Sequence, residues 1–532
     1  MNVTSFITDQ SKISGNLPAI IYSKKKWPWA RPSKKSYSFQ ELEQKINIFA
    51  NTFKHNGISA QDKVLILSPL SADLIAIAFS LFKIGAVPVF IDPGMNLKSF
   101  LQNIKSVEAS ALIGSSKALI LKKIKSKYFS SIKTVINTEN GLIGDSLESL
   151  TRKQDRNCDE YSYKESDIAG LVLTSGATGP SKAVEYTMKM FIEQKIALEK
   201  MLNLSRGEKD LSGFPLFALF SLAIGLPTFI STAIDARVPA LTDGKKLAHE
   251  LIDNNIDFAN GSPSIWISLA KYLLANNLKI KNLKKLAMFG APVSSQLIFD
   301  LKSVLPNCDI YTPYGATESL PVSFISDKII IEETGSLTKQ GRGVCVGHLY
   351  EKVDIEIVNT ENYSKIDKFS PGEIWVSSPM TSLKYFKNEG ENLKSKKMIK
   401  GNLFHHIGDI GYIDDIGRLW YLGRLAHAIH QMNETIYSIE IEGVLNSHPK
   451  IKKSALIKVG SKPCVAVVLT NLFQLEGSKK NDFFDDLVSK NLAHCPKLEK
   501  IENFYILKTF PVDTRHNIKI DRIKIGRSIE KI

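Results

Sequence analysis

The segment Thr174-Ser-Gly-Ala-Thr-Gly-Pro-Ser-Lys182 has the residue types of a phosphate-binding loop, and it directly follows the apolar run at 170–173. Small residues let backbone N–H groups approach phosphate oxygens, hydroxyl groups add donors, and Lys182 adds positive charge. Gly176 and Gly179 do not have the spacing of a Walker loop. The segment therefore predicts a triphosphate site of another kind. An ordinary loop of this composition is the alternative.

Two later segments favour the nucleotide interpretation. Tyr311-Thr-Pro-Tyr-Gly-Ala-Thr-Glu318 is followed by Gly408-Asp-Ile-Gly-Tyr-Ile-Asp-Asp-Ile-Gly-Arg-Leu-Trp-Tyr-Leu-Gly-Arg424. With the first loop, they resemble the signatures of the adenylate-forming superfamily, which includes acyl-CoA synthetases, firefly luciferases and nonribosomal peptide adenylation domains. The resemblance extends from Gly85-Ala-Val-Pro88 to Lys519. It implies an enzyme that uses ATP and Mg²⁺ to convert a carboxylate into an acyl-adenylate.

The resemblance also implies which residues bind ATP. The β- and γ-phosphates would be held by Thr174, Ser175, Gly176, Ala177, Thr178, Gly179 and Lys182. The adenine slot would be formed by Gly290, Ala291, Pro292, Tyr314 and Gly315, with the Tyr314 ring facing the base.

Three residues would act near the metal and the α-phosphate. Thr317 would contact the α-phosphate, and Glu318 would bind Mg²⁺, which prefers carboxylate and phosphate oxygens. Thr178 would be a second contact to the metal.

Three further residues complete the implied site. Asp409 would accept both ribose hydroxyls, and Arg424 would assist it. Lys519 would bridge the substrate carboxylate and the α-phosphate as charge develops there. Preorganised donors of this kind commonly lower a barrier by roughly 2.7–4 kcal/mol each.

Several positions depart from the superfamily pattern. Ala426 replaces the usual Asp or Lys hinge, and Asn433 replaces a Gly that lets the backbone approach the pantetheine arm of CoA. Ala218 stands where many CoA ligases have a His. Arg515-His-Asn-Ile-Lys519 replaces the usual Ser-Gly before the lysine. These departures argue against formation of a CoA thioester.

The same departures resemble one subgroup, the olefin-biosynthesis β-lactone synthetases. The similarity lies at 214–220, 260–263, 312–322, 343–347 and 510–519. It implies a long-chain 2-alkyl-3-hydroxy acid whose own hydroxyl attacks the activated carboxyl and expels AMP. An internal nucleophile makes that step unimolecular.

The apolar segment 216–230 is a candidate lining for an alkyl-chain pocket. Its large apolar residues are Phe217, Phe220, Leu222, Ile224 and Leu226. The alternative is that they pack as core between sheets.

Two other functions remain open. A fatty-acyl-CoA or fatty-acyl-AMP ligase would share every ATP contact. A non-catalytic basic binding protein on the same fold is disfavoured, because all the charged residues of the implied site are present, namely Lys182, Glu318, Asp409, Arg424 and Lys519.

The elements that must position these residues alternate along the chain. Short β-branched runs occur at 64–67, 87–91, 111–113, 134–136 and 170–173, with an apolar helix predicted at 73–85. This alternation predicts α/β layers with largely parallel strands. A β-rich stretch follows at about 340–423, with strands at 372–376 and 417–422.

The chain is then expected to divide into two domains. Residues 1–423 would form a large ATP- and substrate-binding domain with several subdomains, and 424–532 a small mobile α+β lid that carries Lys519. Within the lid, a helix is predicted at 440–446 and a strand at 464–469.

Composition limits location and partners. The 532 residues carry a net charge of +15, which favours anionic partners such as nucleotides, nucleic acid or acidic membranes. Lysines are denser at 24–26 and 122–127, and a lysine-rich solvated surface is the favoured explanation for them. No nucleic-acid motif is apparent. Peripheral association with a membrane or a multienzyme assembly is compatible with this charge.

Cysteine usage and hydropathy favour the cytoplasm. The five cysteines are widely spaced, which fits a reducing compartment. Residues 1–10 lack the features of a signal peptide, and the longest apolar run, 74–82, is far shorter than a membrane span. We expect a soluble cytoplasmic enzyme.

Overall fold

The computed structural model describes residues 1–24, 33–92, 94–139, 143–173, 181–360, 364–366, 369–431, 434–470, 478–512 and 519–530. Six of the expected phosphate-loop residues lie outside these ranges, namely Thr174, Ser175, Gly176, Ala177, Thr178 and Gly179. Asn433 and the segment 515–518 also lie outside them.

The five strands predicted first form one sheet, which confirms the α/β prediction for this part of the chain. Its order is β6-β5-β3-β4-β7-β8, and every neighbouring pair is parallel except β7 and β8. The bounds are β3 (Lys63–Leu67), β4 (Val87–Ile91), β5 (Ala111–Gly114), β6 (Thr134–Asn137), β7 (Gly170–Leu173) and β8 (Ala183–Tyr186).

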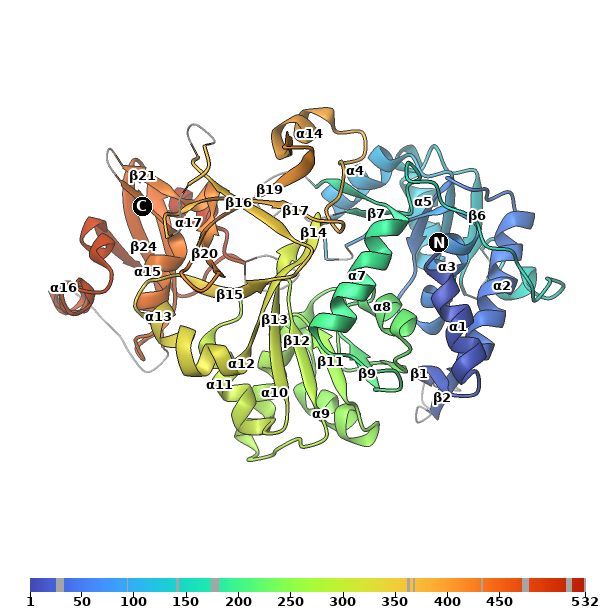
Figure 1. Ribbon diagram of the computed structural model, residues 1–532, viewed down its shortest axis with the longest axis horizontal. Coiled ribbons are helices and arrows are strands. Elements are labelled where there is room, and N and C mark those ends of the chain that lie inside the picture. The colour runs from blue at the N-terminus through green and yellow to red at the C-terminus, as the bar shows by residue number, and fades with distance from the viewer. Residues whose placement is uncertain are drawn as a thin grey trace.

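Helices cover this first sheet (Figure 1). They are α1 (Thr4–Ser14), α2 (Phe39–His55), α3 (Ala72–Lys83), α4 (Leu97–Val107), α5 (Ser116–Ile124) and the short α6 (Leu147–Leu150). The predicted helix at 73–85 is α3, which begins where the Ser71 side chain accepts a hydrogen bond from the N–H of Leu74. Its residues 75–83 are all buried, so the α3 sequence is apolar on every face.

A second parallel layer belongs to a much larger sheet. Neighbouring strands run parallel in the order β13-β12-β11-β9-β10-β1, and β2 is antiparallel to β1. The bounds are β1 (Pro18–Lys24), β2 (Ser33–Ser38), β9 (Asp210–Ser212), β10 (Thr228–Ile230), β11 (Phe258–Gly261), β12 (Lys285–Met288) and β13 (Asp309–Ala316). Its helices are α7 (Met188–Met201), α8 (Phe217–Ile224), α9 (Gly244–Asp253), α10 (Pro263–Ala275) and α11 (Ser295–Val304).

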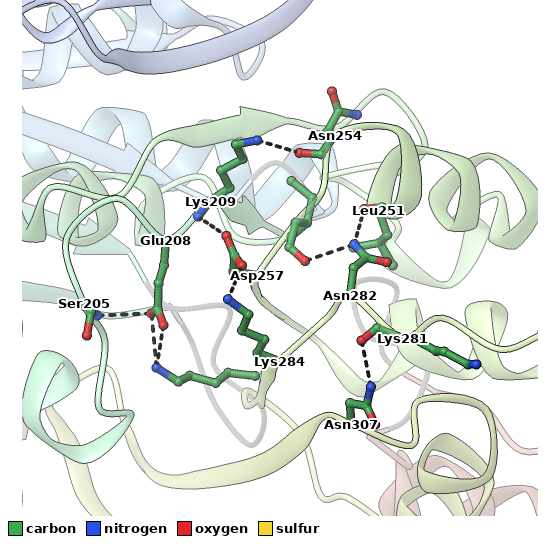
Figure 2. Close-up of polar contacts among 12 residues, drawn as sticks. Ser205, Glu208, Lys209, Leu251, Asn254, Asp257, Lys281, Asn282, Lys284 and Asn307 are labelled. Atoms are coloured by element: carbon green, nitrogen blue, oxygen red, sulfur yellow. Dashed lines mark hydrogen bonds and ion pairs between the residues drawn. The ribbon is translucent and has the colours of Figure 1, made fainter.

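Polar contacts join the amino ends of three of these strands (Figure 2). Asp257 accepts a hydrogen bond of 3.0 Å from the backbone N–H of Lys209 and pairs with Lys284 Nζ at 2.8 Å. Lys285 Nζ contacts both carboxylate oxygens of Glu208 at 2.9 and 3.1 Å. This network fixes the amino ends of β9, β11 and β12, and it leaves their carboxyl ends to face the candidate site.

The same large sheet continues into the predicted β-rich stretch, which is confirmed. The strands here are antiparallel: β14 (Ser319–Ser326), β15 (Val344–Leu349), β16 (Asp354–Val358), β17 (Gly372–Ser377), β18 (Lys396–Ile399), β19 (Asn402–Ile413) and β20 (Arg418–Arg424). Three short helices accompany them, namely α12 (Asp327–Ile329), α13 (Gly335–Lys339) and α14 (Glu389–Ser395).

The chain after β20 forms a smaller α+β unit, drawn in orange and red in Figure 1. Its strands are β21 (Ile429–Gln431), β22 (Glu434–Ile436), β23 (Ile451–Val459), β24 (Lys462–Leu469) and β25 (Asn503–Ile506), and its helices are α15 (Ser438–Leu445), α16 (Ser478–Asn491) and α17 (Arg522–Ile529). The helix and strand predicted here are α15 and β24. The unit has two hydrophobic clusters built only from residues of 429–529.

No helix in the described ranges has both the length and the apolar character needed to cross a membrane.

Candidate active site

The residues expected to form an adenine slot lie at the carboxyl ends of two neighbouring strands. Gly290, Ala291 and Pro292 follow β12, and Tyr314 and Gly315 lie near the end of β13. Because β12 and β13 are parallel, these segments meet at one edge of the sheet, where α/β proteins commonly bind ligands. Gly290 has φ +90°, which favours glycine in the turn that leaves β12.

Asp409, Arg424 and Tyr314 converge from three strands. Asp409 on β19 is the direct cross-strand partner of Arg424 on β20. Arg424 Nε lies 3.1 Å from Asp409 Oδ1, and its Nη1 donates a hydrogen bond of 2.7 Å to the carbonyl of Ile407. The Tyr314 hydroxyl donates a hydrogen bond of 2.7 Å to Asp409 Oδ2. The structure thus brings together three residues that the sequence separates by up to 110 positions.

The electrostatics of Asp409 reflect its burial. The carboxyl is 5% exposed, and burial raises its pKa above the ordinary value. Arg424, the hydrogen bond from Tyr314 and the charge of Lys519 all act in the opposite direction. Burial and the adjacent carboxylate raise the pKa of Tyr314 well above its usual value, so its hydroxyl stays a donor.

One oxygen of Asp409 has an open acceptor position. Among the described residues, no donor meets hydrogen-bond geometry at Oδ1, whose contact with Arg424 is an ion pair. A buried carboxylate oxygen in this state can accept from a hydroxyl group. Asp409 therefore fits the expected contact with a ribose, through Oδ1 more readily than through the oxygen that Tyr314 occupies.

Lys519 reaches this site from the C-terminal unit. The backbone around it is held by a bridge between Val512 and Ile520 and by a hydrogen bond of 2.9 Å from the N–H of Asp521 to the carbonyl of Pro511. Its charge is close enough to Asp409 to lower the pKa of that carboxyl.

Glu318 belongs to a neighbouring cluster centred on Tyr385. The buried Tyr385 donates a hydrogen bond of 2.7 Å from its hydroxyl to Glu318 Oε1. Lys182 Nζ lies 5.0 Å from the centre of the Tyr385 ring, and Lys396 Nζ lies 5.6 Å from it. Lys182 also pairs with Glu391 on α14. Two lysines and two carboxylates, Glu318 and Glu391, therefore lie around a single buried ring.

The backbone next to Glu318 is fixed from both sides. The carbonyl of Thr317 accepts a hydrogen bond of 2.6 Å from the Tyr186 hydroxyl, and the carbonyl of Glu318 accepts one of 2.7 Å from the N–H of Ser382. Thr317 and Glu318 thus lie on a turn between β13 and β14 whose backbone is hydrogen-bonded on both sides.

Sequence reasoning missed Tyr385, Lys396 and His405. Burial lowers the pKa of Lys396 to about 8, against the opposing effect of Glu318. Burial, followed by the charge of Lys396, lowers the pKa of His405 well below its usual value, so its imidazole is neutral at pH 7. Nothing in a lysine-rich sequence distinguishes Lys396 from surface lysines, because only packing places it beside Tyr385.

Glu318 is the one expected metal ligand that the structure describes. The described residues contain no group of three or more His, Cys, Asp or Glu side chains that could hold a metal. A Mg²⁺ ion at Glu318 would also take ligands from phosphate oxygens and water, which is its usual behaviour at nucleotide sites.

A small apolar pocket of about 30 Å³ adjoins the adenine-slot segments. It is lined by Gln194, Leu198, Phe217, Phe220, Phe289, Pro313 and Leu320. Phe289 directly precedes Gly290, and Pro313 directly precedes Tyr314. The pocket is therefore next to the residues expected to bind the nucleotide.

The structure divides the large apolar residues of segment 216–230 into two groups. Phe217 and Phe220 line it, but Leu222, Ile224 and Leu226 are buried in hydrophobic clusters and do not. α8 is apolar on nearly all faces because it is packed on several sides, so its sequence could not show which residues face a cavity. Ala218 is also in the core, whereas Ala426 is exposed in a short 3₁₀ turn after β20.

Comparison with known proteins agrees with this geometry. The profile of the family described as AMP-binding enzyme matches residues 8–386. An olefin beta-lactone synthetase from Xanthomonas campestris pv. campestris is 30% identical over 510 residues, which cover 92% of this chain and 90% of that protein.

Two solved structures share the fold over nearly the whole chain. The amide bond synthetase McbA from Marinactinospora thermotolerans is 18% identical, with a TM-score of 0.81 and 99% of each chain covered. The O-succinylbenzoate coenzyme A synthetase MenE from Bacillus subtilis, in complex with ATP and magnesium ion, is 20% identical, with a TM-score of 0.74 and 98% of each chain covered.

Proposed function

Because the chain belongs to the AMP-binding enzyme family, whose adenylate-forming members activate carboxylic acids with ATP, we propose that it converts a long-chain 2-alkyl-3-hydroxy acid into a β-lactone. The strongest support is the convergence of Asp409, Arg424, Tyr314 and Lys519 beside an apolar pocket, in a chain 30% identical to an olefin beta-lactone synthetase.

In the first half-reaction, a carboxylate oxygen of the acid attacks the α-phosphorus of ATP, and the bond from that phosphorus to the bridging oxygen of pyrophosphate breaks. Asp409 and Arg424 would hold the ribose, and Gly290, Ala291, Pro292, Tyr314 and Gly315 would surround the adenine. Lys519 and Thr317 would stabilise charge at the α-phosphate.

The triphosphate would lie beside Lys182 and the Tyr385 cluster. Lys182 and the residues at 174–179 would bind the β- and γ-phosphates. Mg²⁺ would neutralise charge on the phosphate oxygens, held by Glu318 and Thr178. The MenE structure, which has the same fold, is in complex with ATP and magnesium ion, and this supports the use of both by this chain.

In the second half-reaction, the 3-hydroxyl oxygen attacks the activated carboxyl carbon, and the bond from that carbon to the AMP oxygen breaks. The hydroxyl proton leaves to solvent or to a nearby base, and AMP carries the bond's electrons. The nucleophile is already part of the substrate, so it acts at high effective concentration and needs no CoA channel.

We also propose that residues 424–532 act as a mobile lid on the 1–423 domain. The hydrophobic clusters confined to 429–529 support a separate unit, and the 3₁₀ turn Leu425–His427, in which Ala426 is exposed, would be the hinge. Movement of the lid would bring Lys519 to the α-phosphate and then remove it.

The apolar pocket must widen before it can hold an alkyl chain. Ligand pockets usually measure about 300–1,000 Å³, far more than the volume of about 30 Å³ in this pocket. We propose that Phe217 and Phe220 turn aside when the acid binds. A long-chain acid also partitions into membranes, so the enzyme would meet it at a membrane surface or receive it from a partner enzyme.

The five cysteines are all free thiols, four of them buried. They support action in the reducing cytoplasm.

Turnover of a synthetic 2-alkyl-3-hydroxy acid tests the proposal directly. We expect ATP-dependent release of AMP and pyrophosphate, with mass spectrometry showing a product one water lighter than the acid. Unchanged hydroxy acid, together with CoA-dependent AMP release from a simple fatty acid, would show a fatty-acyl-CoA ligase. A hydroxylamine-trapped adenylate without further product would show an acyl-AMP ligase.

A further inference from the structure

An exposed surface that combines cations with large apolar side chains lies on α5 and the turn after it. In Figure 1, α5 flanks the first sheet in the lobe opposite the C-terminal unit. We call this surface the α5 face, and it consists of Lys117, Ile120, Lys123, Ile124, Lys125 and Lys127.

The α5 face carries two exposed apolar side chains on the outer side of the helix. Ala118 and Leu119 bury the inner side of α5 against the sheet. On the outer side, Ile120 is 43% exposed and Ile124 is 69% exposed. They are four residues apart and so lie one helical turn apart on the same side.

The charged residues near Ile120 and Ile124 in the sequence are all basic. Residues 109–138 contain six lysines and no aspartate or glutamate. The acidic residues that border the stretch are engaged elsewhere: Glu108 pairs with Lys387, and Glu139 accepts a hydrogen bond of 3.1 Å from the backbone N–H of Ser116 at the opposite end of α5. None of the lysines of the α5 face forms an ion pair with a described residue.

We propose that the α5 face binds the surface of a membrane that contains anionic lipids. Ile120 and Ile124 enter the boundary between headgroups and acyl chains, while the lysines contact lipid phosphates. The isoleucines favour a lipid surface over nucleic acid, because single-stranded nucleic acid is bound by stacking on aromatic rings and duplexes by polar contacts. The purpose of this contact, access to a long-chain acid, rests on the proposed function.

Vesicle flotation of the full-length protein, without substrate, tests the proposal. We expect binding to vesicles of phosphatidylcholine with phosphatidylglycerol, weakened by added salt, and little binding to phosphatidylcholine alone. The apolar variant I120S/I124S and the charge variant K123E/K125E/K127E should each lower the partition coefficient by at least about tenfold. All five side chains are exposed, and circular dichroism would verify that both variants fold.

A matched control is available on α10 and the turn after it. Leu274 and Leu278 are 46% and 45% exposed, are also four residues apart, and lie near the exposed Lys271 and Lys279. The variant L274S/L278S should bind vesicles as the wild-type protein does. Four results would overturn the proposal. The first two are wild-type binding by both α5 variants and an equal loss of binding in the control variant. The other two are equal binding of the wild-type protein to neutral and anionic vesicles, and its binding to duplex DNA without binding to vesicles.

Activity separates this proposal from the proposed reaction. The α5 variants should adenylate a short, water-soluble carboxylic acid at the wild-type rate, but their turnover of a long-chain acid embedded in anionic vesicles should fall by at least about tenfold. Vesicle binding is measured without turnover. A failure of the lactone reaction would therefore leave the flotation result intact, and a failure of flotation would leave lactone formation from dispersed substrate intact.

Discussion

The Tyr314 hydroxyl and Asp409 Oδ2 are joined by a hydrogen bond of 2.7 Å that links β13 to β19. Arg424 engages the other carboxylate oxygen at 3.1 Å. Tyr314, expected to face the adenine, and Asp409, expected to bind the ribose, therefore hold each other in position. A substitution of either residue should disturb the position of the other.

Replacing Tyr314 with Phe tests whether the hydrogen bond between Tyr314 and Asp409 orders the nucleotide site. The variant loses a hydrogen bond to a charged group, which is worth about 1.5–3 kcal/mol, so we expect the KM for ATP to rise roughly ten- to hundredfold in pyrophosphate exchange. Tyr421→Phe is the control. The centres of the Tyr421 and Tyr314 rings lie 6.1 Å apart, but the structure shows no hydrogen bond from Tyr421 to Asp409. An unchanged KM in Tyr314→Phe would mean that this bond does not order the nucleotide site.

Lys519 is expected to act in chemistry and not in binding. Lys519→Ala should abolish pyrophosphate exchange while ATP still binds within a few-fold of the wild-type affinity, because the lost cation acts on charge that develops in the transition state. Lys524, which is exposed on α17, provides the control Lys524→Ala. Near-wild-type exchange in Lys519→Ala would remove Lys519 from the mechanism.

Substitutions of Glu318 and Tyr385 should both raise the Mg²⁺ concentration that the enzyme needs, but by different amounts. Tyr385→Phe removes the donor that orients the carboxylate, so the Mg²⁺ concentration for half-maximal rate should rise about tenfold, and Glu318→Gln should raise it further. Glu389→Gln on α14 is the control, because Glu389 is exposed. An unaltered magnesium dependence in Glu318→Gln would contradict the assignment of the metal ligand.

Phe220 should set the length of the acyl chain. Phe220→Trp narrows the apolar pocket, so kcat/KM for a long-chain hydroxy acid should fall roughly 10–200-fold relative to that for a short one. The short acid is the internal control, measured on the same preparation. Equal losses for both acids would place the acyl chain elsewhere.

The buried carboxyl of Asp210 should make stability depend on pH. Burial raises its pKa to about 7, although contacts with Ser221 and Asn260 act against this. The folded state then binds the proton more tightly than the unfolded state, whose pKa is about 4. This contribution is fully present below pH 4 and is lost as pH rises through about 7, by up to roughly 4 kcal/mol.

Asp210→Asn should remove this dependence. The free energy of unfolding of the wild-type protein, measured with urea, should fall relative to that of the variant between about pH 4 and pH 7. Parallel pH profiles for the two proteins would show that Asp210 does not titrate in this range.

Local sequence patterns predicted much of the fold. The runs at 64–67, 87–91, 111–113, 134–136 and 170–173 are the strands β3 to β7, and the apolar helix at 73–85 is α3. These predictions depend on periodicity and end signals within a few residues, which act before distant segments meet. The family was also visible in the chain, because Tyr314, Glu318 and Asp409 keep recognisable neighbours.

Long-range packing decided the rest. Only the folded chain shows that Tyr314 already occupies one oxygen of Asp409, and that Lys396 and His405 join Tyr385 beside Glu318. Only packing separates Phe220, which faces a cavity, from Leu222, which is core. The sequence by itself determined which groups are available for chemistry and which segments become strands or helices. Tertiary structure decided which side chains face one another, because side-chain direction and burial, and hence pKa, depend on neighbours that lie far away along the chain.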